Sequence, residues 1–111
     1  MLRSVDRRTY LDLADTMLAR VARWSDGFDP DEVEAATTDG VVTLEFPDRA
    51  RFVLNRQTAV NQMWFAAGAR AWHYDWNATR STWVDDKDGH ELALRVAEVV
   101  GAKVGRTLPP V

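Results

Sequence analysis

The sequence lacks cysteine entirely and has only two histidines among its 111 residues. Without cysteine there is no disulfide, no thiolate nucleophile and no site that holds a metal or a cluster through sulfur alone. The hydrophobic runs are a few residues long, too short to span a membrane, and residues 1–4 lack the apolar stretch of a signal peptide. With a formal net charge of −3, the protein lacks the basic surface that nucleic-acid binding requires. We therefore expect a cytoplasmic protein that contacts neither membranes nor nucleic acids.

The sequence also lacks the usual signatures of an enzyme. Its six glycines are isolated, so no glycine-rich loop can surround a phosphate, and no serine or threonine has the context of a nucleophile elbow. No Glu-x-x-His pair of the di-iron type is present. His73 and Asp75 would share one face of a strand, as a metal or acid–base pair requires, but a pair of ordinary surface residues is the favoured interpretation. We therefore expect no enzymatic activity.

The charges that are present are unevenly distributed. Residues 1–48 hold 11 acidic residues and five arginines, whereas residues 49–111 hold six acidic and nine basic residues. Between Trp24 and Asp48 there are eight acids and no lysine or arginine. A surface of one sign attracts cations or a basic partner. A solvated acidic edge that only keeps the protein soluble is the favoured alternative for a charge run taken alone.

The hydrophobic spacing predicts a helix near each end of the chain. Residues 6–24 repeat apolar side chains with a period close to 3.6, and a second helix should begin near Asp88, with Glu91 completing a capping pair. The first helix should bury Leu11, Ala14, Met17, Leu18 and Val21. Between the helices the pattern alternates with period 2, which predicts strands. They lie at residues 32–38, 41–46, 51–55, 62–66, 72–76 and 82–84, with Asp39-Gly40 as the first hairpin turn.

The order of these elements defines the expected fold class. Short turns between consecutive strands predict an antiparallel sheet. The class is α+β: a two-layer α/β sandwich with two terminal helices packed on one face of a five- to six-stranded antiparallel sheet. We expect one domain, residues 1–111. Alternation places five aromatic residues in its core: Phe46, Phe52, Phe65, Tyr74 and Trp83.

The other face of the sheet stays open to solvent, and one side chain there does not suit water. Alternation places Trp64 on this open face, beside the amides of Asn55, Gln57 and Gln62. Tryptophan is enriched in binding hot spots, and amides can orient a partner's backbone. Two interpretations stay open: Trp64 binds a partner, or its ring lies flat over its cross-strand neighbours.

The acidic stretch is the second candidate surface. Glu32 and Glu34 are two residues apart on a predicted strand, so we expect both to point the same way. Three aspartates lie in the preceding bend: Asp26, Asp29 and Asp31. Carboxylates without thiolates or imidazoles suit hard cations, and a surface row would bind them weakly, with exchangeable waters.

Several segments taken together resemble the frataxin family. Residues 10–15 resemble the family's first helix, and residues 39–46 resemble its Gly-Val-Leu-Thr hairpin. The most specific match is Asn-Arg-Gln at residues 55–57, followed by Gln-x-Trp-hydrophobic-Ala at residues 62–66. The resemblance covers about residues 8–100, and its order is completed by His73-Tyr74-Asp75-Trp76, Trp83 and Asp88-Gly89 through Leu92.

The resemblance implies a function that composition alone does not. Family members act in iron–sulfur cluster assembly, where they bind a cysteine desulfurase and its scaffold protein as iron-linked regulators or donors. An acidic ridge along the first helix and first strand is expected to bind iron, Fe²⁺ or Fe³⁺, weakly and exchangeably. The implied ridge residues are Asp15, Asp26, Asp29, Asp31, Glu32 and Glu34. The implied partner contacts are Asn55, Gln57, Gln62, Trp64 and His73.

The sequence departs from the family pattern at three positions. Arg20 and Arg23 stand where bacterial relatives usually carry acids, so they should weaken cation binding by like-charge repulsion. Ala59 replaces the usual turn proline and should loosen that loop. The alternative function is therefore an iron-independent regulator that binds the desulfurase through the acidic edge and the open face. In either case we expect a bacterial, cytoplasmic monomer.

Overall fold

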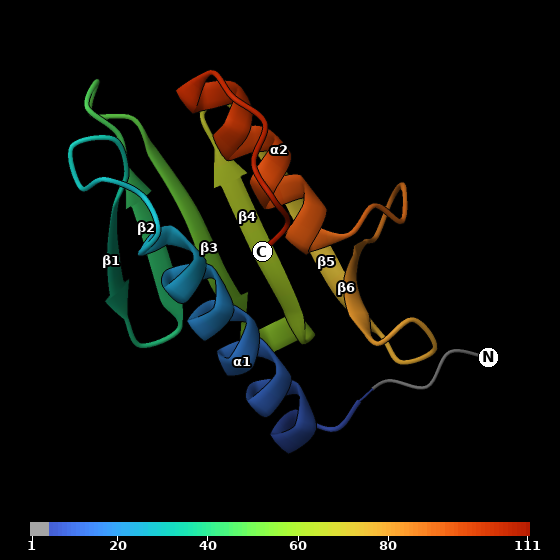
Figure 1. The fold of residues 1–111 in the computed structure, drawn as a ribbon. Helices are drawn as coiled ribbons and strands as arrows, with labels where there is room; N and C mark the ends of the chain where they lie inside the picture. The colour runs from blue at the N-terminus through green and yellow to red at the C-terminus, as the bar shows by residue number, and fades with distance from the viewer. Residues whose placement is uncertain (1–4) are drawn as a thin grey trace.

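The computed structural model describes residues 5–111, so residues 1–4 of the expected domain lie outside the described residues. Along the chain, a helix is followed by three strands, a short 3₁₀ turn, three more strands and a second helix (Figure 1). Their bounds are α1 Arg7–Ser25, β1 Glu34–Thr38, β2 Val41–Glu45, β3 Arg51–Gln57, the 3₁₀ turn Thr58–Val60, β4 Gln62–Ala67, β5 Arg70–Asn77, β6 Thr82–Asp85 and α2 Leu92–Val104.

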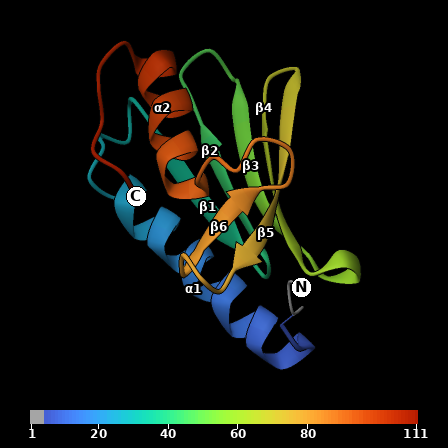
Figure 2. The same ribbon diagram turned by 90° about the vertical axis from the view of Figure 1, so that its right-hand side faces the viewer.

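The strands form one antiparallel sheet in the order β1-β2-β3-β4-β5-β6, so each strand pairs with its neighbours in sequence. Both helices pack on the same side of this sheet, as the view turned by 90° shows (Figure 2). The predicted fold class, a two-layer α+β sandwich with a six-stranded antiparallel sheet, is confirmed. In the described part of the chain, neither helix is both long and apolar enough to cross a membrane.

The core lies between the sheet and the helices. All five aromatic residues expected in it are buried, together with the alternate aliphatic positions of β2 and β3. On α1 the predicted stripe is correct at four positions, Ala14, Met17, Leu18 and Val21, but Tyr10 is fully buried while Leu11 is only partly so. Burial raises the pKa of Tyr10, whose hydroxyl donates to the Gln62 carbonyl at 2.8 Å and so connects α1 to β4.

The expected start of the second helix is wrong. The N-cap is Glu91, whose side chain makes no capping bond, and not Asp88. The Asp88 carboxylate instead accepts the His90 backbone N–H at 2.9 Å and bonds Arg95 at 3.0 Å. Asp88 therefore stabilises the turn before α2, while the Glu91 side chain pairs with Arg80. At the other end, the helix continues through Gly101, where a Cβ would lie 2.6 Å from the Arg106 carbonyl oxygen.

The expected first strand also begins too early. Backbone N–H groups of Glu32 and Val33 both donate to the Asp29 carbonyl, at 2.8 and 3.1 Å, which forms a turn. Strand β1 starts only at Glu34. The expectation that Glu32 and Glu34 share one strand is therefore wrong, because Glu32 lies in the turn before it.

Candidate functional site

The open sheet face carries a compact group of side chains around Trp64. The cross-strand partners of Trp64 are Asn55 on β3 and His73 on β5. Its indole stacks on the His73 ring, with centroids 4.4 Å apart and planes 21° from parallel. The ring therefore lies flat over its neighbour, which is the second of the two interpretations that the sequence left open. This stacking holds a large aromatic surface in a fixed position while leaving it half-buried.

Gln62 is the centre of the hydrogen bonds on this face. Its Oε1 accepts the Trp64 indole N–H at 2.9 Å, and its Nε2 donates to Asp75 Oδ1 at 3.0 Å and Asp86 Oδ2 at 3.1 Å. The amide thus connects β4 to β5 and to the turn after β6. Asp86 was not expected here, since it follows the last strand. No sequence pattern marks this position, because Asp86 is held by a backbone bond outside the strands, in which its N–H donates to the His73 carbonyl at 2.9 Å.

The remaining two expected contact residues lie on the same face. Asn55 donates its side-chain amide to the Arg56 carbonyl at 3.1 Å, and Gln57 is the cross-strand partner of Gln62. Both side chains are half-buried. The sheet therefore brings all five expected contact residues onto one surface, which we call the open-face cluster: Asn55, Gln57, Gln62, Trp64 and His73.

The expected acidic residues, in contrast, do not gather. Arg56 lies on the helix side of β3 and forms ion pairs with Asp15 of α1 and with Asp39 of the β1–β2 turn, the latter at 3.2 Å. The hydrogen bond to the Asp15 carboxylate raises the pKa of Arg56 above its ordinary value. Asp15 is thus neutralised by an arginine that the sequence pattern left unassigned.

Glu32 is also paired with an arginine. Both of its carboxylate oxygens accept from Arg106, which follows α2, one of them at 2.9 Å. Glu34 has a different surrounding, since it is exposed on β1 opposite Glu45. Glu32 is therefore paired, whereas Glu34 has no ion pair among the described residues.

Three aspartates of the bend between α1 and β1 remain exposed: Asp26, Asp29 and Asp31. Asp29 Oδ1 accepts the backbone N–H of Asp31 at 2.9 Å, which leaves its second oxygen free of that bond. Across residues 5–111, no three histidine, cysteine, aspartate or glutamate side chains come close enough to form a metal site. The donors are hard oxygens on a solvated bend, so they suit a weakly held, exchangeable cation and not a closed coordination shell.

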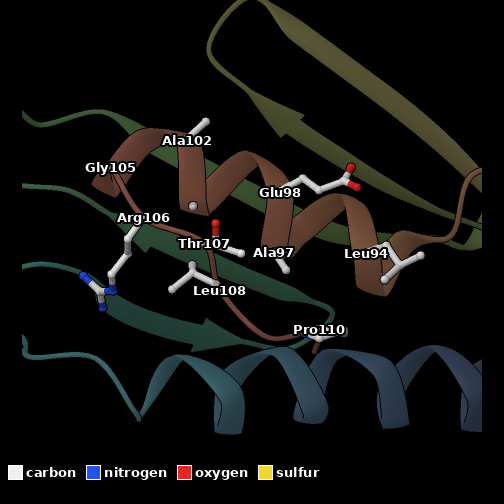
Figure 3. Close-up of a pocket in the computed structure, with 10 residues that line it drawn as sticks. Leu94, Ala97, Glu98, Ala102, Gly105, Arg106, Thr107, Leu108 and Pro110 are labelled. Carbon is white, nitrogen blue, oxygen red and sulfur yellow. The ribbon is translucent and has the colours of Figure 1, made fainter.

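Arg20 has a structural partner in the last residues of the chain. Its guanidinium donates to the Val111 carbonyl at 2.8 Å, and the Trp24 indole donates to the Pro109 carbonyl at 3.1 Å. Leu108 and Pro110 lie between α2 and α1, over a groove beside Gly101 (Figure 3). One of the two unexpected arginines on α1 therefore binds the C-terminal segment.

This arrangement defines a class of protein: an α/β sandwich with an open sheet face and an acidic edge. The chain belongs to the frataxin family, since the family model described as "Frataxin-like domain" matches residues 3–106.

Curated relatives support the same family assignment. The iron-sulfur cluster assembly protein CyaY of Thioalkalivibrio sulfidiphilus is 39% identical over 70 residues, which cover 63% of this chain and 65% of that protein. The protein of the same name from Ralstonia nicotianae is 36% identical over 95 residues, covering 82% of this chain and 81% of that protein. Among solved structures, frataxin from Psychromonas ingrahamii superposes with a TM-score of 0.79 at 24% identity, covering 94% of this chain and 96% of that one. The structural match supports the fold.

Proposed function

We propose that this protein is a non-enzymatic accessory factor of iron–sulfur cluster assembly, which binds a cysteine desulfurase and its scaffold protein. The observation that carries the proposal is the open-face cluster, in which a stacked, half-buried tryptophan lies among oriented amides on a face that neither helix of the described chain covers. Aromatic rings held in place lose little entropy on binding, so such a surface suits a protein partner. The names of the curated relatives supply the pathway.

The partner contact is tested by pull-down of a purified cysteine desulfurase, with desulfurase activity as the second readout. Trp64→Ala should weaken binding at least about tenfold, which corresponds to the loss of one hot-spot contact. Thr43→Ala is the matched control, because Thr43 lies on the open side of β2, away from the stack. Equal binding by the two variants would show that the open-face cluster is not the contact.

Iron binding is the second part of the proposal. The exposed aspartates of the bend, with Glu34 on the neighbouring strand, offer oxygen ligands that hold Fe²⁺ or Fe³⁺ weakly as exchangeable cargo. Asp15 and Glu32 contribute less, because each is already paired with an arginine. Titration of the ¹⁵N-labelled protein with Fe²⁺ should broaden the amide signals of residues 26–34 before those of Asp15. If millimolar Fe²⁺ leaves every signal sharp, the iron-binding part is wrong.

The ion pairs of Asp15 and Glu32 with arginines favour the alternative function, an iron-independent regulator of the desulfurase. Two of the six expected ligands are neutralised from outside the acidic stretch, so the protein has less carboxylate available than its sequence suggests. An iron-independent regulator would bind the desulfurase equally well after a chelator is added. Comparing desulfurase activity with and without this protein, each with and without iron, distinguishes the two functions.

A further inference from the structure

Strand β1 forms one edge of the sheet and has β2 as its one strand neighbour. Among the described elements, none lies beyond its outer side (Figure 1). Thr38 and Val41 face each other across the two-residue turn Asp39-Gly40. Residues that flank such a turn exchange their backbone hydrogen bonds, and the bonded pairs then alternate along the strand. The N–H and C=O groups of Ala35 and Thr37 therefore point to the free side.

The opposite edge of the sheet is protected by the chain itself. Val84 of β6 forms a bridge with Glu91, and the Asp85 N–H donates to the His90 carbonyl at 2.8 Å. The β1 edge has no such cover, and its sequence, Glu-Ala-Ala-Thr-Thr, contains neither the proline nor the lysine that commonly block edge pairing. Four of its five residues are exposed. The β6 edge is thus covered by the chain itself, whereas the backbone groups on the outer side of β1 remain available for pairing.

A groove of about 470 Å³ lies beside this edge, between α1 and the β1–β2 hairpin. Buried Leu18 and Val42 contribute apolar surface to it. Three carboxylates line it as well, but Asp15 and Asp39 are paired with Arg56, so among the described residues Asp26 is the lining carboxylate without an arginine partner. Arg23 is the one basic side chain among the described residues that line it. A strand added to β1 would place alternate side chains over this groove.

The charges decide which strand can be added. A second copy of this chain is disfavoured, because Glu34 of one copy would lie near Asp39 of the other in an antiparallel pair and near its own equivalent in a parallel pair. A lysine or arginine has an aliphatic stem that can cover the apolar part of the groove and a charged end that can reach the carboxylates.

We propose that the free edge of β1 accepts an extended segment of a partner protein, with lysine or arginine at alternate positions, as a seventh strand of the sheet. Main-chain hydrogen bonds to Ala35 and Thr37 would supply affinity, and the carboxylates of Glu34 and Asp26, which have no arginine partner among the described residues, would select basic side chains. The inference deepens the proposed function and rests on it for the claim that this partner belongs to the cluster-assembly machinery. The binding mode is tested apart from it.

The test uses the whole ¹⁵N-labelled protein and synthetic seven-residue peptides. A peptide that alternates lysine with valine or threonine should slow exchange of the Ala35 and Thr37 amide protons at least about threefold, and should leave Ala36 unchanged because that amide already bonds β2. Its affinity should fall as salt rises. The same peptide with glutamate in place of lysine should not bind. Binding of the glutamate peptide, or exchange protection elsewhere, would overturn the proposal.

Two changes separate strand addition from charge attraction. A lysine peptide of equal charge with proline at its central positions keeps the attraction but loses the main-chain bonds, so it should bind at least about tenfold more weakly. Thr37→Pro removes the outward N–H from the protein side and should weaken the unmodified peptide similarly. Because the proline peptide uses the wild-type protein, the result does not depend on whether Thr37→Pro folds. Equal binding of the two lysine peptides would refute strand addition.

The outcome is also distinct from that of the proposed function. If the lysine peptide fails to bind while the desulfurase is still captured through Trp64, strand addition is wrong and the accessory function stands. If the peptide binds at β1 but no desulfurase is captured, the accessory function fails and the edge binds a basic segment of another protein.

Discussion

The two surfaces of this protein that we propose to act satisfy their polar groups in opposite ways. In the open-face cluster, side chains bond to near neighbours on adjacent strands, as Gln62 does to Trp64 and Asp75. On the acidic side, carboxylates bond to bases from distant segments, as Glu32 does to Arg106, 74 residues away. The first network holds an aromatic ring in a fixed position on the open face. The second neutralises carboxylates on the acidic side.

The difference shows that net local charge is a poor guide to cation capacity. The stretch between Trp24 and Asp48 has eight acids and no base of its own, yet four of them form ion pairs in the structure: Glu32, Asp39, Glu45 and Asp48. Asp15 on α1 is paired as well. The acidic residues that stay free are those of the bend, together with Glu34. The predictions below test whether each network behaves as its geometry requires.

The largest expected effect is on the open face. Trp64→Ala should lower the free energy of unfolding by about 1.5–3 kcal/mol, because it removes a half-buried ring and its stacking on His73. Trp64→Phe is the matched comparison, since it keeps an aromatic ring but loses the bond to Gln62, and it should cost about 0.5–1.5 kcal/mol. Urea unfolding measures both values. Equal losses would mean that the stacking contributes nothing.

Breaking the long-range network at Arg56 should have the next largest effect. Arg56→Met removes the ion pairs to Asp15 and Asp39 and should cost about 1–2 kcal/mol, discounted because both carboxylates are exposed. Arg51→Met is the control: its pair with Glu45 is exposed on both sides, with 66% and 39% of the side chains accessible, so it should change stability by less than about 0.5 kcal/mol. A larger loss for Arg51→Met would contradict this ranking.

The open face could be predicted from the sequence because its contacts are set by alternation. In an antiparallel meander with short turns, each strand's register follows from the turn before it, so Trp64 and His73 had to meet. Asp86 could not be placed, since it follows the last strand and its position depends on the turn toward α2.

The acidic surface could not be predicted in the same way. The pairing of Asp15 with Arg56 spans 41 residues and depends on how α1 crosses the sheet, which no local period encodes. The alternating pattern predicts a strand over residues 32–38, but the Asp29 carbonyl accepts the N–H groups of Glu32 and Val33 and so holds them in a turn. Local hydrogen bonding prevailed over the alternating pattern there.

A smaller effect is expected at Arg106, where a substitution should change iron binding more than stability. Arg106→Gln should release Glu32, increase Fe²⁺-induced broadening at residues 26–34 about two- to threefold at equal iron, and change stability little, because the pair is solvent-exposed. Arg80→Gln removes another exposed arginine pair, with Glu91, far along the chain from the bend, and should leave the broadening unchanged. Stronger iron broadening in both variants would indicate a general effect of net charge and would contradict a specific role for the Glu32 pair.

The smallest effect concerns Asp48, the last acid of the stretch, which pairs with Lys103 of α2. The Lys103 ammonium holds the pKa of Asp48 below its ordinary value, and the Ala50 backbone N–H lowers it further. Since the pKa is lower in the folded state, this carboxylate stabilises the fold above its unfolded pKa of about 4, and the contribution disappears as pH falls through the folded value. Lys103→Met should raise the pKa of Asp48 toward its ordinary value, as ¹³C NMR titration of the carboxyl carbon would show, and should make acid unfolding begin at a higher pH. Lys87→Met removes the other lysine of the chain and should leave the Asp48 titration unchanged. If both variants shift Asp48 equally, the pairing with Lys103 is only part of a general field, and the distinction between specific long-range pairs and unpaired acids on this surface would not hold.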